Sequence, residues 1–216
     1  MIVPRGLREG AAVFVFVHGH RTSADEVMRR SALARSFLQS RVNALLVVPD
    51  SPRDRSEPLR WPQLADLLSV AARGAGVDSP PDGPIIVVAH SGGYRTVARW
   101  TRHRRLRQII LLDGLYGAVG TFDHWLRASR AHRLVAFGAG THARALRWAR
   151  SVRGAAIMAR PPRGPRELDW NTRHAPLLVL HARTTHAALG RARAVFDLAI
   201  ALGQLEPLDA PRAWSR

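Results

Sequence analysis

The chain has 216 residues, of which 33 are basic and 16 acidic, so its formal net charge is +17. Hydrophobic residues make up 46% and charged residues 23%, a balance that is typical of a folded globular protein and excludes a disordered chain. The sequence contains no cysteine, which excludes disulfides, cysteine nucleophiles and thiolate metal sites.

The length predicts one domain over residues 1–216, because a single α/β domain routinely reaches about 200–250 residues. No apolar run approaches the ~20 residues of a membrane span. The first ten residues carry charges and lack the apolar stretch of a signal peptide. We therefore expect a soluble cytoplasmic protein.

Strands and helices are predicted in alternation. Six short apolar runs predict strands that are covered on both faces, at residues 12–17, 44–48, 85–89, 108–112, 133–137 and 176–180. Helices are predicted at residues 23–39, 61–75, 93–104, 141–152 and 188–202. This alternation predicts an α/β fold with a doubly wound, mostly parallel sheet of about six strands and helices on both faces.

The positive charge could indicate a nucleic-acid partner, because basic domains bind phosphates. However, all 33 basic residues are arginine and they are spread over the whole chain, a pattern that codon bias in a GC-rich genome would produce. The one dense run, at residues 102–107, has no nucleic-acid-binding motif beside it. We therefore expect a solvated arginine-rich surface and not nucleic-acid binding.

Polar residues follow the predicted strands, at the edge where ligands bind in an open parallel sheet. They are His18, Gly19, His20 and Arg21 after the first strand, His90 and Ser91 after the third, Asp113 after the fourth, residues 138–141 after the fifth, and Thr184, Thr185 and His186 after the sixth. A serine, an acid and a histidine thus occur at three strand ends, in that chain order.

The sharpest motif is Ala-His-Ser-Gly-Gly at residues 89–93, between an apolar strand and a helix. It is a small-x-Ser-x-Gly version of the nucleophile elbow, with alanine where glycine is more usual. In such a turn the serine takes a strained backbone, and its neighbours two positions away pass too close to other atoms to be bulky. The amino end of the following helix favours a developing negative charge.

From Val13 to about Leu202 the chain resembles the α/β-hydrolase superfamily, with the His-Gly pair after the first strand and the elbow motif about 70 residues later. The usual leading β-hairpin is missing, so the resemblance implies a compact, minimal fold without a large cap. It further implies that Ser91 is the nucleophile and that the backbone N–H groups of His20 and Gly92 bind the oxyanion.

The resemblance also implies a base after the last strand and an acid after the fourth or fifth. His186 fits the base, whereas His174 precedes the last strand and His181 ends it. Because residues 138–142 contain no carboxylate, Asp113 is the candidate acid. Its alternative role is that of a turn residue in an Asp-Gly pair, and the competing acid is Asp169.

Further residues are expected to bind substrate or to shape its pocket: His18, Gly19, Arg21, His90 and Tyr116, with Arg21, Arg95 and Tyr116 at the rim. The arginines suggest an anionic acyl substrate. No metal-ligand spacing and no complete dinucleotide-binding motif is found, and the chemistry needs no cofactor.

We therefore predict an esterase-, lipase- or thioesterase-like serine hydrolase. It would cleave a carboxylic ester or thioester, and less readily an amide, in a small-molecule acyl substrate. The alternative is a binding protein of the same fold whose serine site is catalytically idle.

Overall fold

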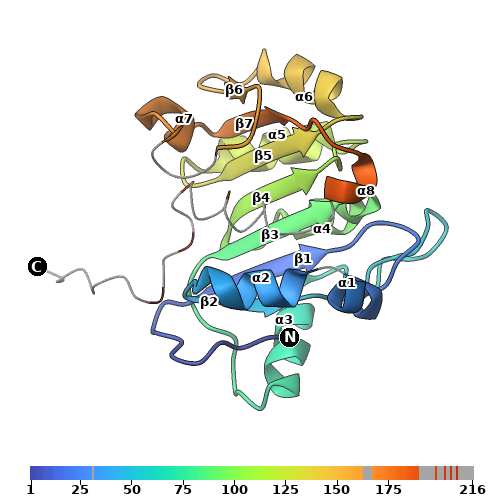
Figure 1. Ribbon diagram of the computed structural model, residues 1–216, viewed down its shortest axis with the longest axis vertical. Coiled ribbons are helices and arrows are strands. Elements are labelled where there is room, and N and C mark those ends of the chain that lie inside the picture. The colour runs from blue at the N-terminus through green and yellow to red at the C-terminus, as the bar shows by residue number, and fades with distance from the viewer. Residues whose placement is uncertain are drawn as a thin grey trace, which may run out of the picture.

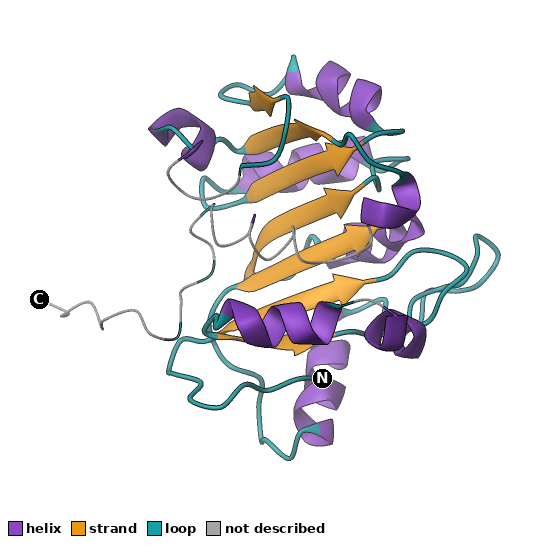
Figure 2. Cartoon of the chain, in the orientation of Figure 1, coloured by secondary structure: helices purple, strands orange, loops and turns teal. Residues whose placement is uncertain are grey.

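The computed structural model describes residues 1–30, 32–162 and 167–189, together with residues 198, 202, 205 and 208. In this part of the chain seven strands form one sheet in the order β2-β1-β3-β4-β5-β7-β6, with every neighbouring pair parallel (Figures 1 and 2). The strands are β1 (Ala12–Val17), β2 (Ala44–Val47), β3 (Ile85–His90), β4 (Leu106–Leu112), β5 (Arg133–Gly138), β6 (Ala156–Met158) and β7 (Leu177–His181). The predicted α/β class and parallel sheet are confirmed.

The predicted number of about six strands is corrected to seven by β6. This strand has three residues, lies at the edge of the sheet and pairs only with β7, with Ala156 opposite Leu178. Three residues are too few to give a periodic pattern in the sequence, and this strand is only partly buried. It could therefore not be recognised from hydrophobicity alone.

The helices of the described chain are α1 (Ala24–Arg30), α2 (Leu33–Ser40), α3 (Leu64–Gly74), α4 (Tyr94–Trp100), α5 (Val119–Ala128), α6 (His142–Ala149), α7 (Trp170–His174) and α8 (His186–Leu189). A single 3₁₀ turn, η1 (Ser91–Gly93), precedes α4.

The predicted helices differ from the structure in two respects, and a third prediction lies largely outside the described residues. The predicted helix 23–39 is two helices, because Ala32 leaves the helical region at ψ 19°. Helices α5 and α7 were not predicted, although Phe122 and Trp125 in α5 are buried three residues apart. Of the predicted helix 188–202, residues 190–197 and 199–201 lie outside the described residues.

Helices cover both faces of the sheet, as predicted. One face carries the odd-numbered residues of β1 and is covered along the sheet by α3, α4, α5 and α6, with bulky aromatic side chains such as Trp100 and Phe122. On the other face α2 packs against the even-numbered residues of β1, with Leu33 and Phe37 buried. Because both faces are covered, all six residues of β1 are buried, which explains its continuous apolar sequence.

The strand order creates a crevice between β1 and β3. After β1 the chain leads to α1 and α2 on one face, whereas after β3 it leads to α4 on the other. Loops that diverge in this way leave a space at the carboxyl ends of two neighbouring strands, which is where open α/β sheets bind ligands. In Figure 1 this edge lies at the right, where the strand arrows point and where α8 also lies.

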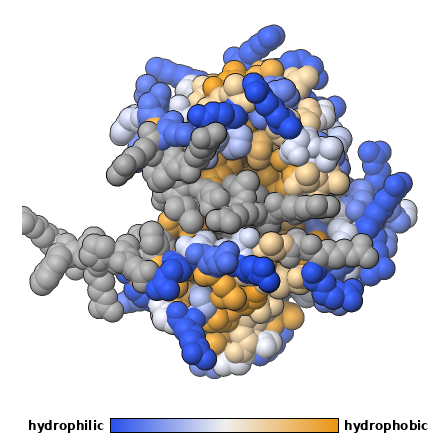
Figure 3. Space-filling model, viewed as in Figure 1, coloured by the Kyte–Doolittle hydropathy of each residue, from blue (hydrophilic) through white to orange (hydrophobic). Residues whose placement is uncertain are grey.

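The exterior is arginine-rich, and hydrophilic side chains are spread around the outline of the face shown in Figure 3. Within the dense run at residues 102–107, Arg105 donates to the backbone oxygens of Pro81 and Gly83, and Arg107 donates to that of Arg104. Arg105 and Arg107 therefore stabilise nearby loops through hydrogen bonds. No described helix is both long enough and apolar enough to span a bilayer.

Candidate active site

Ser91 stands at a sharp turn between β3 and η1, as the elbow motif predicted. Its φ is +50°, in the left-handed region, where a residue other than glycine costs about 1–3 kcal/mol. A Cβ atom added to Gly93 would lie 2.8 Å from the Val17 oxygen, and one added to Gly19 would lie 2.8 Å from the Ser91 Cβ. The predicted turn, its strained backbone and the need for small neighbours are therefore confirmed.

The predicted oxyanion donors, His20 and Gly92, lie beside Ser91. A Cβ atom on Gly92 would lie 2.2 Å from His20 Nε2, so the imidazole packs directly on the glycine backbone. The backbone N–H groups of both residues take part in no hydrogen bond between described residues. Both N–H groups are thus free to bind an external acceptor.

Asp113 is held rigidly at the end of β4, where its φ is +44°. Its side chain is only 2% exposed, and Oδ1 accepts hydrogen bonds from the Thr141 N–H at 2.8 Å and the Thr141 hydroxyl at 2.9 Å. Burial opposes ionisation, but the hydrogen bonds from His186, Thr141 and Gly140 outweigh it and hold the pKa of Asp113 below its ordinary value. The side chain is therefore a carboxylate at neutral pH.

His186 is the first residue of α8 and pairs with this carboxylate. Its Nδ1–H donates to Asp113 Oδ2 at 2.8 Å, which fixes the tautomer and leaves Nε2 without a proton in the neutral ring. His90 Nε2–H donates to the backbone oxygen of His186 at 3.0 Å, and the two rings lie 4.7 Å apart. The His186 segment is therefore anchored by its neighbour in the elbow.

A hydrogen bond between the Ser91 hydroxyl and His186 was also predicted. None joins these two described residues, so that contact is not confirmed. The His186 side chain is 42% exposed and remains open to solvent on the side away from Asp113.

The other residues considered for the base and the acid make contacts away from Ser91 and His186. The His181 ring stacks on that of His142, and His174 donates to the backbone oxygen of Trp170. Asp169 caps α7, where Oδ1 accepts from the Thr172 N–H at 2.6 Å. The carboxylate that contacts His186 is that of Asp113.

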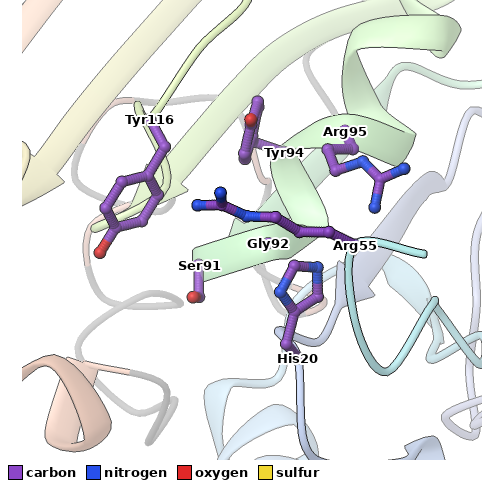
Figure 4. Close-up of a pocket in the computed structure, with 7 residues that line it drawn as sticks. All are labelled: His20, Arg55, Ser91, Gly92, Tyr94, Arg95 and Tyr116. Atoms are coloured by element: carbon purple, nitrogen blue, oxygen red, sulfur yellow. The ribbon is translucent and has the colours of Figure 1, made fainter. Parts of the chain in front are cut away.

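A cavity of about 630 Å³ opens at Ser91. Seven described residues line it: His20, Arg55, Ser91, Gly92, Tyr94, Arg95 and Tyr116 (Figure 4). The expected rim residues Tyr116 and Arg95 are among them, together with the expected oxyanion donors His20 and Gly92. Arg21 is not, and its backbone N–H donates to the Arg53 oxygen. Gly19 lies beside Ser91, since a Cβ atom added to it would lie 2.8 Å from the Ser91 Cβ.

Two histidines that were predicted to bind substrate make structural contacts. His18 is 1% exposed, and its Nε2 accepts the Ser51 N–H at 2.9 Å while Nδ1–H donates to the Gly19 oxygen. Because His18 is buried, it has no surface that a substrate could contact. Its hydrogen bonds connect the loops that follow β1 and β2. His90 holds the backbone of His186, and burial lowers the pKa of its ring.

Several residues of the site were missed by sequence reasoning. Thr141 and Gly140 hold Asp113, and Gly138 must be small because a Cβ atom there would lie 2.7 Å from Asp113 Oδ1. The Gly-x-Gly-Thr sequence directly after β5 was the available signal for them. Arg55 lies in an irregular loop whose sequence gives no such signal.

Comparison with protein-family models found no match, and comparison with curated proteins found no significant relative. Among the described residues, no group of three or more histidine, aspartate or glutamate side chains is arranged to hold a metal ion. The arrangement of Ser91, His186 and Asp113 is therefore the basis for assigning a function.

Proposed function

We propose that the protein is a serine hydrolase that cleaves a carboxylic ester or thioester, and less readily an amide, in a small-molecule acyl substrate. The observation that carries this proposal is the hydrogen bond between buried Asp113 and His186, at the same sheet edge as the strained turn of Ser91. A buried carboxylate that fixes a histidine tautomer is the arrangement a serine nucleophile requires.

In the first half of the reaction, Ser91 Oγ attacks the acyl carbon while His186 Nε2 takes the hydroxyl proton. Asp113 stabilises the imidazolium that forms. The carbonyl oxygen becomes an oxyanion and accepts hydrogen bonds from the backbone N–H groups of His20 and Gly92. In other enzymes the loss of one such donor raises the barrier by about 3–4 kcal/mol.

The tetrahedral intermediate then collapses, and His186 gives its proton to the leaving alcohol or thiol. The acyl group remains as an ester of Ser91. Water attacks this ester while His186 accepts one proton, and collapse of the second intermediate releases the acid and restores the Ser91 hydroxyl. The exposed side of the His186 ring gives water access for this step.

The missing hydrogen bond between Ser91 and His186 is compatible with this scheme. Catalytic hydrogen bonds are often long in unliganded enzymes and shorten in the substrate complex.

We also propose that the sheet belongs to a minimal α/β-hydrolase fold. That assignment is supported by the pairing of β1, which ends at His18-Gly19, with β3, which ends at the elbow.

A fluorophosphonate probe tests the proposal, because it reacts only with activated serine hydroxyls. We expect labelling of the peptide that contains Ser91 in the native protein and none in Ser91→Ala. Ser151→Ala is the matched control and should label fully, since the Ser151 hydroxyl only donates to the Trp148 oxygen. A folded native protein that stays unlabelled and hydrolyses no ester would instead support the idle binding protein.

A further inference from the structure

The cavity at Ser91 is positively charged. Arg55 and Arg95 both line it, and none of its described lining residues is acidic. Burial is the largest cause that lowers the pKa of His20, and the charges of Arg95 and Arg55 lower it further, whereas the nearby Asp54 carboxylate partly offsets them. Positive charge concentrated in a partly enclosed space attracts anions more strongly than the same charge on an open surface.

Arg55 makes no hydrogen bond or ion pair with another described residue. The two carboxylates of the same loop accept hydrogen bonds from other groups. Asp54 Oδ1 accepts from the Ser56 N–H, the Ser56 hydroxyl and the Glu57 N–H, at 2.7 to 3.0 Å. Glu57 accepts the Arg53 N–H at 2.9 Å. One oxygen of each acid is therefore bound within the loop, and the Arg55 guanidinium has no hydrogen-bond or ion-pair partner among the described residues.

The loop that carries Arg55 is tied to the helix that follows Ser91. Arg95 in α4 donates to the Asp54 backbone oxygen at 3.2 Å. Figure 4 shows the Arg55 side chain extending across the cavity in the direction of Tyr116, while Ser91 lies below it. The rings of Tyr94 and Tyr116 lie 6.4 Å apart and add aromatic surface to the wall.

We propose that Arg55 binds a carboxylate or phosphate group of the substrate, and that the enzyme selects acyl compounds bearing such an anion. This inference rests on the proposed function of Ser91. A guanidinium forms charge-assisted, often bidentate hydrogen bonds with either anion. Arg95 is a positioning residue that holds the Arg55 loop over the nucleophile, and the two tyrosines contact the apolar part of the substrate.

Two esters of equal chain length test the selection. Mono-p-nitrophenyl glutarate carries a terminal carboxylate, and p-nitrophenyl valerate carries a methyl group in its place. We expect kcat/KM to be at least about tenfold higher for the glutarate ester, and this preference to disappear in Arg55→Gln. Arg55→Lys should keep part of it, and Arg53→Gln, a neighbour outside the cavity, should keep all of it.

A second pair of substrates locates the anion. S-acetyl coenzyme A carries phosphates on the leaving thiol, and S-acetyl pantetheine lacks them. An Arg55-dependent preference for the first compound places the anion on the leaving group, whereas one confined to the glutarate ester places it on the acyl chain. Equal kcat/KM within both pairs, or equal losses in Arg55→Gln and Arg53→Gln, would overturn the inference.

A binding measurement separates this inference from the proposed catalysis. The mono-p-nitroanilide of glutarate and the p-nitroanilide of valerate can be titrated calorimetrically into the Ser91→Ala protein. We expect the anionic anilide to bind at least about tenfold more tightly, and Arg55→Gln to abolish the difference. If the probe fails to label Ser91 but this difference is found, catalysis fails while the anion site stands. If labelling succeeds and no difference is found, the anion site fails while catalysis stands.

Discussion

The nucleophile side and the acid–base side of the candidate site are built in different ways. Around Ser91 the structure depends on backbone conformation and close packing, with glycines at positions 19, 92 and 93 where any Cβ atom would collide with its neighbours. Around His186 it depends on side-chain hydrogen bonds that reach across the sheet from β4 and from the loop after β5.

The difference lies in how each side responds to substitution. On the nucleophile side, an added methyl group displaces atoms, and activity falls because geometry is lost. On the acid–base side, the removal of one polar atom leaves the backbone in place but changes a tautomer or a pKa. The two sides can therefore be perturbed separately, and the size and pH dependence of each effect identify which side has changed.

The largest effect is expected from Asp113→Asn, which removes the carboxylate but keeps its shape. The amide favours the wrong tautomer of His186, so turnover should fall by up to about 10⁴-fold while the fold is kept. Steady-state ester hydrolysis and circular dichroism measure the two quantities. Asp169→Asn is the control and should have nearly native turnover. The reverse pattern would transfer the acid role to Asp169.

A smaller loss is expected from Gly93→Ala on the nucleophile side. The new Cβ atom would lie 2.8 Å from the Val17 oxygen and 2.9 Å from the His18 oxygen. Both are backbone atoms, so the elbow and the loop that carries the His20 donor must move apart. We expect kcat to fall by about 10²–10³-fold, as for the loss of one donor. Gly74→Ala is the control, because no atom lies within 4 Å of the added Cβ. Unchanged kcat in Gly93→Ala would argue against the assigned His20 donor.

A third effect concerns stability on the acid–base side. Thr141→Val removes the hydroxyl that donates to Asp113, and we expect a loss of roughly 1–3 kcal/mol in the free energy of unfolding at pH 7. Thr141→Ser keeps the donor and should lose less. Urea unfolding measures both variants against the native protein.

The pH dependence of that loss follows from the lowered pKa of Asp113. A carboxyl whose pKa is depressed in the folded state contributes stability above its unfolded pKa of about 3.9, and this contribution is lost as pH falls through the folded value. The difference between native and Thr141→Val proteins should therefore be full at pH 7 and shrink below about pH 4. A difference that stays constant down to pH 3 would indicate a packing effect and not a charge effect.

The smallest effect is expected from His90→Gln, with His90→Ala as its contrast. His90 donates to the backbone oxygen of His186, and a glutamine amide can replace that donor whereas alanine cannot. We expect kcat to fall about tenfold or less in His90→Ala, and KM for a small neutral ester to stay nearly unchanged. Equal losses in both variants would show that the ring itself, and not its hydrogen bond, is required.

The parts of the molecule that were predictable from sequence have local signals. Six strands are continuous apolar runs because both faces of the sheet are covered, and the turn of Ser91 needs small residues at fixed spacing. The edge strand β6 and Arg55 have no such signal, and the signals for helix α5 and Thr141, two apolar residues three apart and a Gly-x-Gly-Thr sequence, are weak. Thr141 and Arg55 reach the site only because distant segments of the chain meet at one edge of the sheet.

The position of β7 has a consequence for the order in which the molecule forms. β7 lies between β5 and β6, so β6, which is earlier in the chain, has no partner strand until β7 inserts. His186 follows β7 and meets Asp113 across 73 residues of sequence, whereas the glycines packed around the turn of Ser91 follow β1, β3 and β4. Contacts between such distant residues form late, because a long loop must close before they are made. The pair of His186 and Asp113 is therefore expected to form among the last steps of folding, after the strands that surround Ser91 have paired.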